Sequence, residues 1–165
     1  MSDHTEQNHH DGQSRSGGQQ PVQASGSCLC NAVKYTAAVP LEAGACHCSM
    51  CRKWAGGPLM AVHALGDVKF IGEESIQRFR SSEWAERGFC KNCGSNLFYY
   101  VRPREGLPEG QYIFPTGTVD SPASFNFAQE LFVDHAEDWY AFTSDSSRQE
   151  LTEAEVFAMY GASPD

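Results

Sequence analysis

Short stretches of alternating apolar and polar residues recur along the chain and predict β-strands. In the stretch Ala32–Ala37, Val33 and Tyr35 fall on one side of the pattern, as in a strand with one buried face. The same reasoning predicts further strands at Leu59–Ala64, Val68–Ile71, Ile76–Arg80, Asn96–Val101, Tyr112–Phe114 and Trp139–Phe142. Glycine and proline residues separate several of these stretches, which is typical of short strands joined by turns.

Helical signals are fewer than strand signals. Ser49–Trp54 is long enough for a single helical turn. The sequence Thr152-x-x-Glu155 matches a capping box and precedes the apolar residues Val156 and Phe157. The pattern as a whole predicts a mostly-β single domain with a short C-terminal helix.

The N-terminal segment lacks this patterning. Residues 1–25 are rich in Ser, Gly, Gln, Asn and His and contain almost no apolar side chains. Such a segment cannot bury enough surface to offset the entropy that it would lose on ordering. We therefore predict a disordered tail over residues 1–25 and a folded domain over residues 26–165.

Composition and charge narrow the possible function classes. The chain has 165 residues, about the size of one domain, and 41% of them are hydrophobic, which suffices for a core. The net charge of −9 argues against binding to a nucleic-acid backbone. No apolar run reaches the roughly 20 residues of a membrane span, and the N-terminus does not resemble a secretory signal. We therefore expect a cytoplasmic protein with neither a membrane nor a nucleic acid as partner.

Seven cysteines fall into three tight groups and carry the main chemical signal. The groups are Cys28-Leu29-Cys30, Cys46-His47-Cys48-Ser49-Met50-Cys51 and Cys90-Lys91-Asn92-Cys93. Without a secretory signal, a metal or catalytic role is favoured over a disulfide framework. Closely spaced cysteine pairs are common in zinc sites, because a tight turn directs two sulfurs at one ion.

The first and third groups together can supply four thiolates. In an extended segment Cys28 and Cys30 point to the same side, so both sulfurs can reach one ion. Asn31 and Gly94 follow the two pairs and can relax their turns, since both residue types tolerate a left-handed backbone. Four thiolates form a closed, structural site. A metal that joins Cys28 to Cys90 would close a long loop much as a cross-link does.

The middle group contributes Cys46, Cys48 and Cys51. On a regular helix these positions do not share one face, so the segment must be a turn or an irregular knuckle if the three sulfurs converge. If Cys46 and Cys48 face an ion, His47 faces away between them. Three protein ligands leave a fourth position open, which is typical of catalytic zinc sites.

Three other arrangements remain open at this point. The cysteines could form three disulfides with one free thiol, or one four-cysteine site with three unligated buried thiols. Cys28 and Cys30 could also share an ion with two cysteines of the middle group.

Three motifs, in this order, resemble those of the glutathione-dependent formaldehyde-activating enzyme family, which includes centromere protein V. They are Gly26–Tyr35, Cys46–Lys53 and Phe89–Ser95, and together they contain all seven cysteines. The resemblance extends to about Trp139. The chain departs from the family pattern at Asn31, where Gly is usual, and at Glu130, where a His commonly stands.

The resemblance implies a β-tent fold of coiled β-sheets and two zinc ions. One zinc would be structural, on Cys28, Cys30, Cys90 and Cys93, and the other catalytic, on Cys46, Cys48 and Cys51. The family's reaction joins formaldehyde to the thiol of glutathione to give S-hydroxymethylglutathione. The implied function is therefore that of a zinc-dependent carbon–sulfur lyase acting on a thiol–aldehyde adduct.

Three residues beside the second cysteine group are candidates for contact with a substrate. His47 could donate a proton in the reaction, because histidine titrates near neutrality. Arg52 and Lys53 could bind the carboxylates of a glutathione-like thiol, and arginine can grip a carboxylate with two hydrogen bonds. The alternative function is a non-catalytic, zinc-stabilised module that binds glutathione or a protein.

Overall fold

The structure, a computed structural model, describes residues 20–121 and 125–160, and its strands form two sheets. The four-stranded sheet has the order β10-β1-β2-β5 and contains β1 (Val22–Ser27), β2 (Lys34–Val39), β5 (Leu65–Ile71) and β10 (Val119–Ser121). The eight-stranded sheet has the order β12-β11-β3-β4-β9-β8-β7-β6 and contains β3 (Glu42–Cys46), β4 (Leu59–His63), β6 (Ile76–Arg80), β7 (Ala85–Cys90), β8 (Asn96–Val101), β9 (Gln111–Pro115), β11 (Asn126–Leu131) and β12 (Gln149–Leu151). The α-helices are α1 (Ser49–Ala55) and α2 (Glu153–Tyr160).

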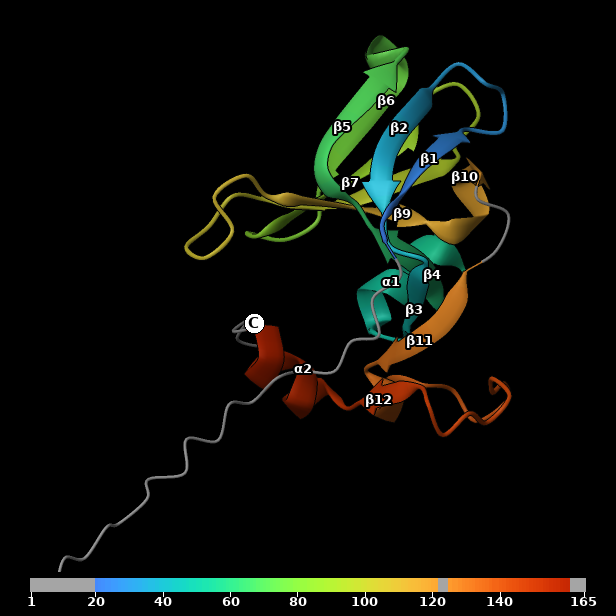
Figure 1. Cartoon of the computed structure of the whole chain (residues 1–165), viewed down its shortest axis with the longest axis vertical. Coiled ribbons are helices and arrows are strands. Elements are labelled where there is room, and N and C mark those ends of the chain that lie inside the picture. Colours follow the sequence, from blue (N-terminus) through green and yellow to red (C-terminus); the bar gives the residue numbers. More distant parts are fainter. Residues whose placement is uncertain (1–19, 122–124, 161–165) are drawn as a thin grey trace, which may run out of the picture.

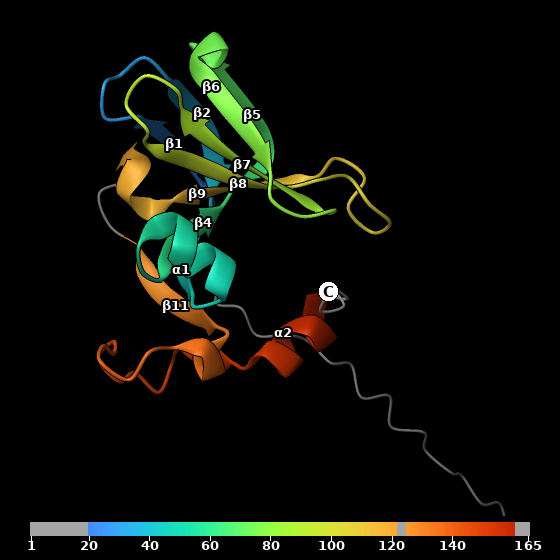
Figure 2. The same ribbon diagram turned by 180° about the vertical axis from the view of Figure 1, so that it is seen from behind.

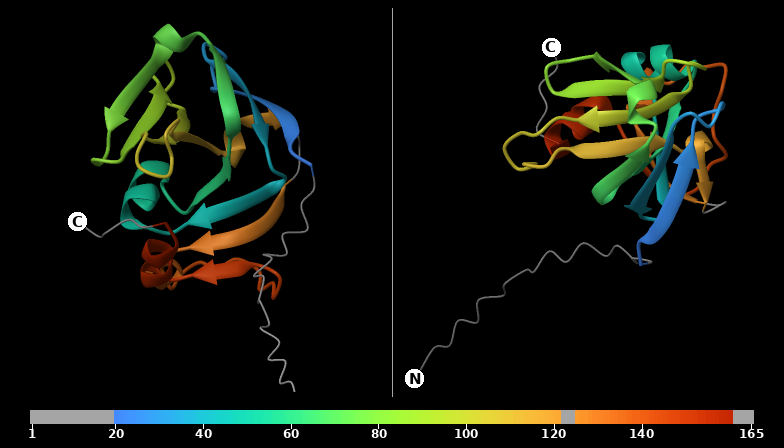
Figure 3. Two further views of the ribbon diagram at one scale, coloured as in Figure 1. Left: turned by 60° about the vertical axis from the view of Figure 1, so that its left-hand side comes forward. Right: turned by 90° about the horizontal axis from the view of Figure 1, so that it is seen from above.

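The elements follow one another along the long axis of the molecule. Figure 1 shows β1, β2 and β5 at one end, α1, β3 and β11 in the middle, and β12 and α2 at the other end. The view from behind shows α1 next to β4, on the same side as β7 and β8 (Figure 2). In the left view of Figure 3, β3, β11 and β12 lie side by side, in agreement with their order in the sheet. The elements α1, β3 and β11 therefore lie between the end with β1, β2 and β5 and the end with β12 and α2.

The main core fills the space between the two sheets. Tyr35 of β2 stacks on Phe114 of β9 with ring centroids 3.9 Å apart, and Phe70 of β5 lies 5.5 Å from Phe98 of β8. Tyr35 is 2% exposed, and Phe98 and Phe114 are fully buried. Each buried aromatic ring contributes about 1.5–3 kcal/mol, so this cluster holds the sheets against each other.

β11 is the strand that connects the middle of the molecule to its C-terminal part. It pairs in parallel with both β3 and β12, whereas the other strand pairs are antiparallel. Gly44 of β3 permits the close approach, because a Cβ there would come within 3.2 Å of the carbonyl oxygen of Gln129. The register places Leu131 opposite Cys46, so the end of β11 lies beside the second cysteine group.

The predicted fold class is confirmed: the protein is mostly β with a short C-terminal helix. Six of the predicted strands occur, as β2, β4, β5, β6, β8 and β9. The helical turn predicted at Ser49–Trp54 also occurs, as α1. The capping box also forms, since the Thr152 N–H donates to Glu155 Oε2 at 2.8 Å and the Glu155 N–H donates to Thr152 Oγ1 at 3.4 Å. The predicted strand Trp139–Phe142 is wrong. This segment is irregular, because Tyr140 and Phe142 contact His47 instead of pairing with a strand.

The alternation pattern missed β1, β3, β7 and β11, which are rich in Gly, Ala and polar residues. β1 begins at Val22, before the predicted start of the domain at residue 26, and its Ala24 is 1% exposed. The small side chain of Ala24 carries little apolar signal but packs closely in the core. Most of the predicted tail, residues 1–19, lies outside the described residues. No helix within the described ranges has the length and apolar character needed to cross a bilayer.

Candidate functional site

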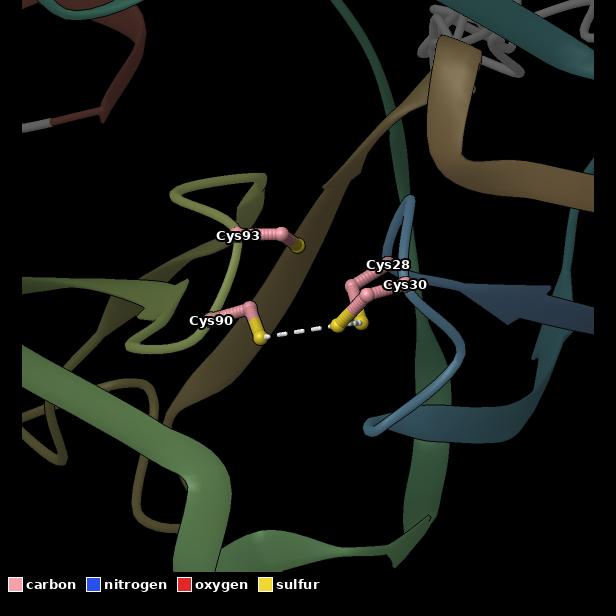
Figure 4. A group of neighbouring side chains, drawn as sticks. All are labelled: Cys28, Cys30, Cys90 and Cys93. Atoms are coloured by element: carbon pink, nitrogen blue, oxygen red, sulfur yellow. Dashed lines mark hydrogen bonds between the residues drawn. The ribbon is translucent and has the colours of Figure 1, made fainter.

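Four cysteines from two distant turns form the first cluster. Cys28 and Cys30 lie in the turn between β1 and β2, whereas Cys90 ends β7 and Cys93 lies in the turn after it. Figure 4 shows the four side chains converging from these two turns, and all four sulfurs lie within 4.8 Å of one another. Tetrahedral zinc with bonds of about 2.3 Å needs sulfurs about 3.8 Å apart. The Cys28–Cys30 and Cys30–Cys90 sulfur distances of 3.6 and 3.8 Å fit that requirement.

Both turns are held by backbone hydrogen bonds and by residues with a left-handed backbone. Asn31 has a φ of 59° and donates its N–H to the Cys28 carbonyl at 2.9 Å. Gly94 has a φ of 75° and donates to the Cys90 carbonyl at 2.8 Å. The expectation that both positions relax their turns is confirmed, and Asn31 can replace the usual Gly because Asn visits this conformation readily.

The first cluster can carry negative charge without an ion. The Ser95 hydroxyl lies 3.3 Å from the Cys93 sulfur, and hydrogen bonds from the Ser95 side chain and backbone lower the pKa of Cys93 to about 5. The Val33 amide donates to the Cys28 sulfur at 3.3 Å. Such donors stabilise thiolates, which are the form of cysteine that binds metals.

Cys46, Cys48 and Cys51 form the second cluster at the junction of β3 and α1. Their sulfurs all lie within 4.8 Å of one another. Cys46 ends β3, and Cys48 is the N-cap of α1, with an extended backbone and a sulfur that accepts the Cys51 amide at 3.4 Å. The chain thus changes from strand to helix between the first and last cysteine. The irregular knuckle expected from the spacing is confirmed.

The three thiols of the second cluster lie close enough together to shift one another's pKa values. Hydrogen bonds from the thiols of Cys46 and then Cys51 lower the pKa of Cys48 to about 2. Donation to Cys48 and Cys51, followed by burial, raises the pKa of Cys46. Three converging sulfurs are a compact set of soft donors that suits a divalent zinc ion.

The geometry argues against two of the three alternatives that the spacing left open. All seven cysteines have free thiols in the structure, so the disulfide arrangement is not found. Cys28 and Cys30 meet the third group and not the middle one, and the three middle sulfurs converge on their own. The grouping is therefore four plus three.

His47 lies on the far side of the knuckle from the sulfurs that flank it. Its side chain is 1% exposed, with Nε2 2.9 Å from Glu130 Oε2 and Nδ1 3.0 Å from the Tyr140 hydroxyl. Arg148 completes the group, with Nε 2.7 Å from Glu130 Oε1. The sequence singled out His47 and Glu130 separately, but no local spacing could link them, because Glu130 comes from β11 and Tyr140 and Arg148 come from the irregular C-terminal segment.

Arg52 and Lys53 line a cleft of about 460 Å³ beside α1, together with Glu137, Trp139 and Tyr140. Arg52 donates to the carbonyl oxygen of His47 at 2.8 Å and forms an ion pair with Glu137. The cysteines themselves do not line this cleft. The two basic residues predicted to bind a substrate thus line the same cleft, and in α1 they follow Cys51 directly.

A third basic residue, Arg87 of β7, lies at the second cluster and was not predicted from the sequence. Its Nη2 lies 3.7 Å from the Cys51 sulfur, although the two residues are 36 positions apart. The residue belongs to a strand that the alternation pattern did not predict. No local spacing signal could therefore have linked it to the second cluster.

The chain is similar to known proteins over the region that contains both cysteine clusters. The family model described as glutathione-dependent formaldehyde-activating enzyme matches residues 23–135. An uncharacterized lyase from Schizosaccharomyces pombe is 29% identical over 124 residues, which cover 74% of this chain and 87% of that protein. A putative glutathione-dependent formaldehyde-activating enzyme from Halomonas elongata is 33% identical over 85 residues, which cover 46% of this chain and 54% of the relative.

Proposed function

The chain belongs to the glutathione-dependent formaldehyde-activating enzyme family, and on that premise we propose that it is a zinc-dependent carbon–sulfur lyase. The substrate class is a thiol–aldehyde adduct, such as the S-hydroxymethylglutathione formed from glutathione and formaldehyde. The observation that carries this proposal is the second cluster, in which three converging sulfurs leave a fourth coordination position for a substrate.

The two clusters have different roles in this proposal. Cys28, Cys30, Cys90 and Cys93 would hold a structural zinc ion. Cys46, Cys48 and Cys51 would hold the catalytic one. When bound at the second cluster, zinc lowers the pKa of a bound thiol and polarises a carbonyl oxygen, so that a thiolate can meet an activated aldehyde at neutral pH.

Arg52 and Lys53 are proposed to bind the carboxylates of the thiol substrate. Their cleft lies beside α1, and Lys53 forms no salt bridge among the described residues. The carboxylate of Glu137 already pairs with Arg52, which supports the proposal that this guanidinium binds a substrate carboxylate. A substrate carboxylate would replace Glu137 there or bind to Lys53.

His47 is proposed to supply a proton to the substrate side. Glu130 accepts from Nε2, which directs the opposite nitrogen, Nδ1, toward the Tyr140 hydroxyl. Tyr140 also lines the cleft with Arg52 and Lys53. When both ring nitrogens of His47 are protonated, Nδ1–H donates to the Tyr140 oxygen, and a proton that passes to this oxygen is balanced by loss of the phenolic proton of Tyr140 toward the cleft.

An exchange measurement by NMR tests the proposed reaction. Formaldehyde and glutathione combine spontaneously, so the rate with zinc-loaded protein must exceed the uncatalysed rate, and the Cys48→Ser variant serves as the matched control. Acceleration by the wild type alone supports the lyase. Glutathione binding without acceleration would overturn it in favour of the non-catalytic binding module.

Variants of the cleft test the role of its basic residues. Replacing Arg52 with Gln should raise the KM for glutathione about tenfold, the effect of one lost charge-assisted hydrogen bond. The KM for 2-mercaptoethanol, which has no carboxylate, should not change. An equal loss for both thiols would contradict carboxylate binding by Arg52.

A further inference from the structure

Arg87 is a buried cation in the interior of the eight-stranded sheet. The residue is 4% exposed and lies in β7, where it pairs with Tyr99 of β8. Its guanidinium carbon lies 4.9 Å from the ring centroid of Trp54 and 5.0 Å from that of Tyr99. The two aromatic rings therefore fix the guanidinium group beside the second cluster.

The guanidinium has one protein partner and one donor without a partner. Nη2 lies 3.7 Å from the Cys51 sulfur, whereas the buried Nη1 has no hydrogen-bond partner. Among the described residues, no carboxylate forms a salt bridge with Arg87. A buried, unpaired charge is strongly unfavourable, so the cysteine cluster must supply the compensating negative charge.

Charge balance indicates why a cation belongs at this position. Three thiolates around a divalent ion leave one negative charge, which Arg87 neutralises. A fourth, anionic sulfur then joins a site that is neutral overall. Without Arg87, the same sulfur would join a site that is already negative, in a buried place where like charges repel strongly.

We propose that Arg87 is the positioning residue that lets the second cluster accept an anionic thiolate as its fourth ligand. This inference rests on the proposed function and adds to it the group that offsets the charge of the incoming thiol. The unpartnered Nη1–H is then explained as a donor kept for a ligand bound at the cluster. Arg87 thereby selects thiolates over neutral ligands.

Cobalt(II) in place of zinc allows the inference to be tested by spectroscopy. Thiolate binding to the cobalt-loaded protein produces a sulfur-to-cobalt charge-transfer band, and difference spectra isolate it from the constant signal of the four-cysteine cluster. The ligands to titrate are 2-mercaptoethanol, which tests the sulfur charge without carboxylates, and imidazole, which is neutral. Cobalt is kept saturating, because residues around a metal site can change metal affinity about 10–100-fold.

The variant Arg87→Gln removes the charge but keeps a hydrogen-bond donor. We expect it to weaken 2-mercaptoethanol binding at least about tenfold and to leave imidazole binding unchanged. The conservative variant Arg87→Lys should recover most of the thiol affinity. Arg78→Gln is the matched control, since Arg78 also stacks on an aromatic ring, 4.8 Å from the centroid of Phe98, but donates to the Tyr112 hydroxyl and forms no hydrogen bond with a cysteine among the described residues.

Each result supports or overturns the inference. Equal thiol affinity in the wild type and in Arg87→Gln would overturn it while leaving the proposed function intact. An equal loss for thiol and imidazole would also overturn it, because a purely structural role predicts that result. If Arg87→Gln does not fold, the Arg87→Lys variant is titrated in its place. A folded Arg87→Lys protein that no longer binds 2-mercaptoethanol would overturn the inference, because its positive charge at this position is retained. A wild-type protein that binds no thiol would overturn the proposed function as well.

Discussion

The two cysteine clusters use the same donor atoms but are built in different ways. The first joins two turns that are distant in sequence, with Cys30 and Cys90 separated by 60 positions. The second lies within the single segment from Cys46 to Cys51 at one strand–helix junction. A metal in the first cluster would therefore act as a long-range cross-link, whereas a metal in the second would constrain only a local turn.

The surroundings of the two clusters differ as well. The first includes one exposed cysteine, Cys30, and receives hydrogen bonds from the Val33 amide and the Ser95 hydroxyl. The second has no exposed cysteine and contacts the buried cation Arg87. The difference is that neutral donors contact the sulfurs of the first cluster, whereas a fixed positive charge lies beside the sulfur of Cys51 in the second.

The largest effect is expected from breaking the first cluster. Replacing the fully buried Cys90 with Ser removes one ligand from the cross-link between distant turns. The contribution of a structural zinc site is comparable to the whole stability of a domain, about 5–15 kcal/mol, so we expect the variant to unfold. Circular dichroism and NMR dispersion measure this outcome. A folded Cys90→Ser protein that keeps its full metal content would contradict the assigned role of the first cluster.

A smaller loss of stability is expected when the ion pair between Arg148 and Glu130 is removed. The Arg148 side chain is 5% exposed and forms a 2.7 Å ion pair with Glu130, which in turn holds His47. Replacing Arg148 with Met leaves the buried Glu130 carboxylate with His47 but without its cationic arginine partner, and should cost about 3 kcal/mol. Urea unfolding monitors the loss, and the first cluster should keep its metal. Arg148→Lys, which preserves the charge, is the control, and equal stability of Arg148→Met and wild type would show that the ion pair gives no support.

A substitution in the turn of the first cluster should have a modest effect. Gly94 has a φ of 75°, but a Cβ there would meet no atom within 4 Å. Replacing Gly94 with Ala should therefore cost only the strain of the left-handed backbone, about 1–2 kcal/mol. Gly72→Ala is the contrasting variant, since its Cβ would lie 1.9 Å from the Ala32 carbonyl oxygen. Thermal unfolding should rank Gly72→Ala as clearly less stable, and the reverse order would contradict the geometry of the turn.

The smallest change in stability is expected at Cys48, despite a complete loss of activity. Serine at an N-cap accepts the same backbone hydrogen bond that the Cys48 sulfur accepts from Cys51, so α1 keeps its cap. We expect Cys48→Ser to change the unfolding free energy by less than about 1 kcal/mol and to lose one equivalent of metal. Calorimetry and metal analysis check both points. Unfolding of Cys48→Ser would remove the distinction between the two clusters.

Removal of metal tests the difference between the two cysteine clusters without a mutation. Mild chelation should take one equivalent from the second cluster while the protein stays folded. Stronger chelation should empty the first cluster and unfold the domain, because that metal closes the longer loop. Metal analysis and circular dichroism, recorded on the same samples, test the order. Simultaneous loss of both ions would contradict separate structural and catalytic roles.

Local sequence predicted a large part of the fold and the ligand sets. The strands β4, β6 and β8 follow from alternation, and the seven cysteines follow from their spacing. The prediction failed where strands contain small or polar residues, as in β3 with its Gly44, because such residues carry little periodic signal. It also failed at Trp139–Phe142, whose aromatic side chains serve contacts with His47 and Phe127 and not a strand.

The sequence by itself determined which atoms are candidates to bind metal, since Cys46, Cys48 and Cys51 lie within six residues of one another along the chain. Tertiary structure alone decided which charges meet that knuckle. Arg87 reaches Cys51 from β7, and Glu130 reaches His47 from β11, across 36 and 83 positions respectively. The physical reason is that ligand spacing is a property of a short backbone segment, whereas the electrostatic environment of a buried site depends on strands that only the folded sheet brings together.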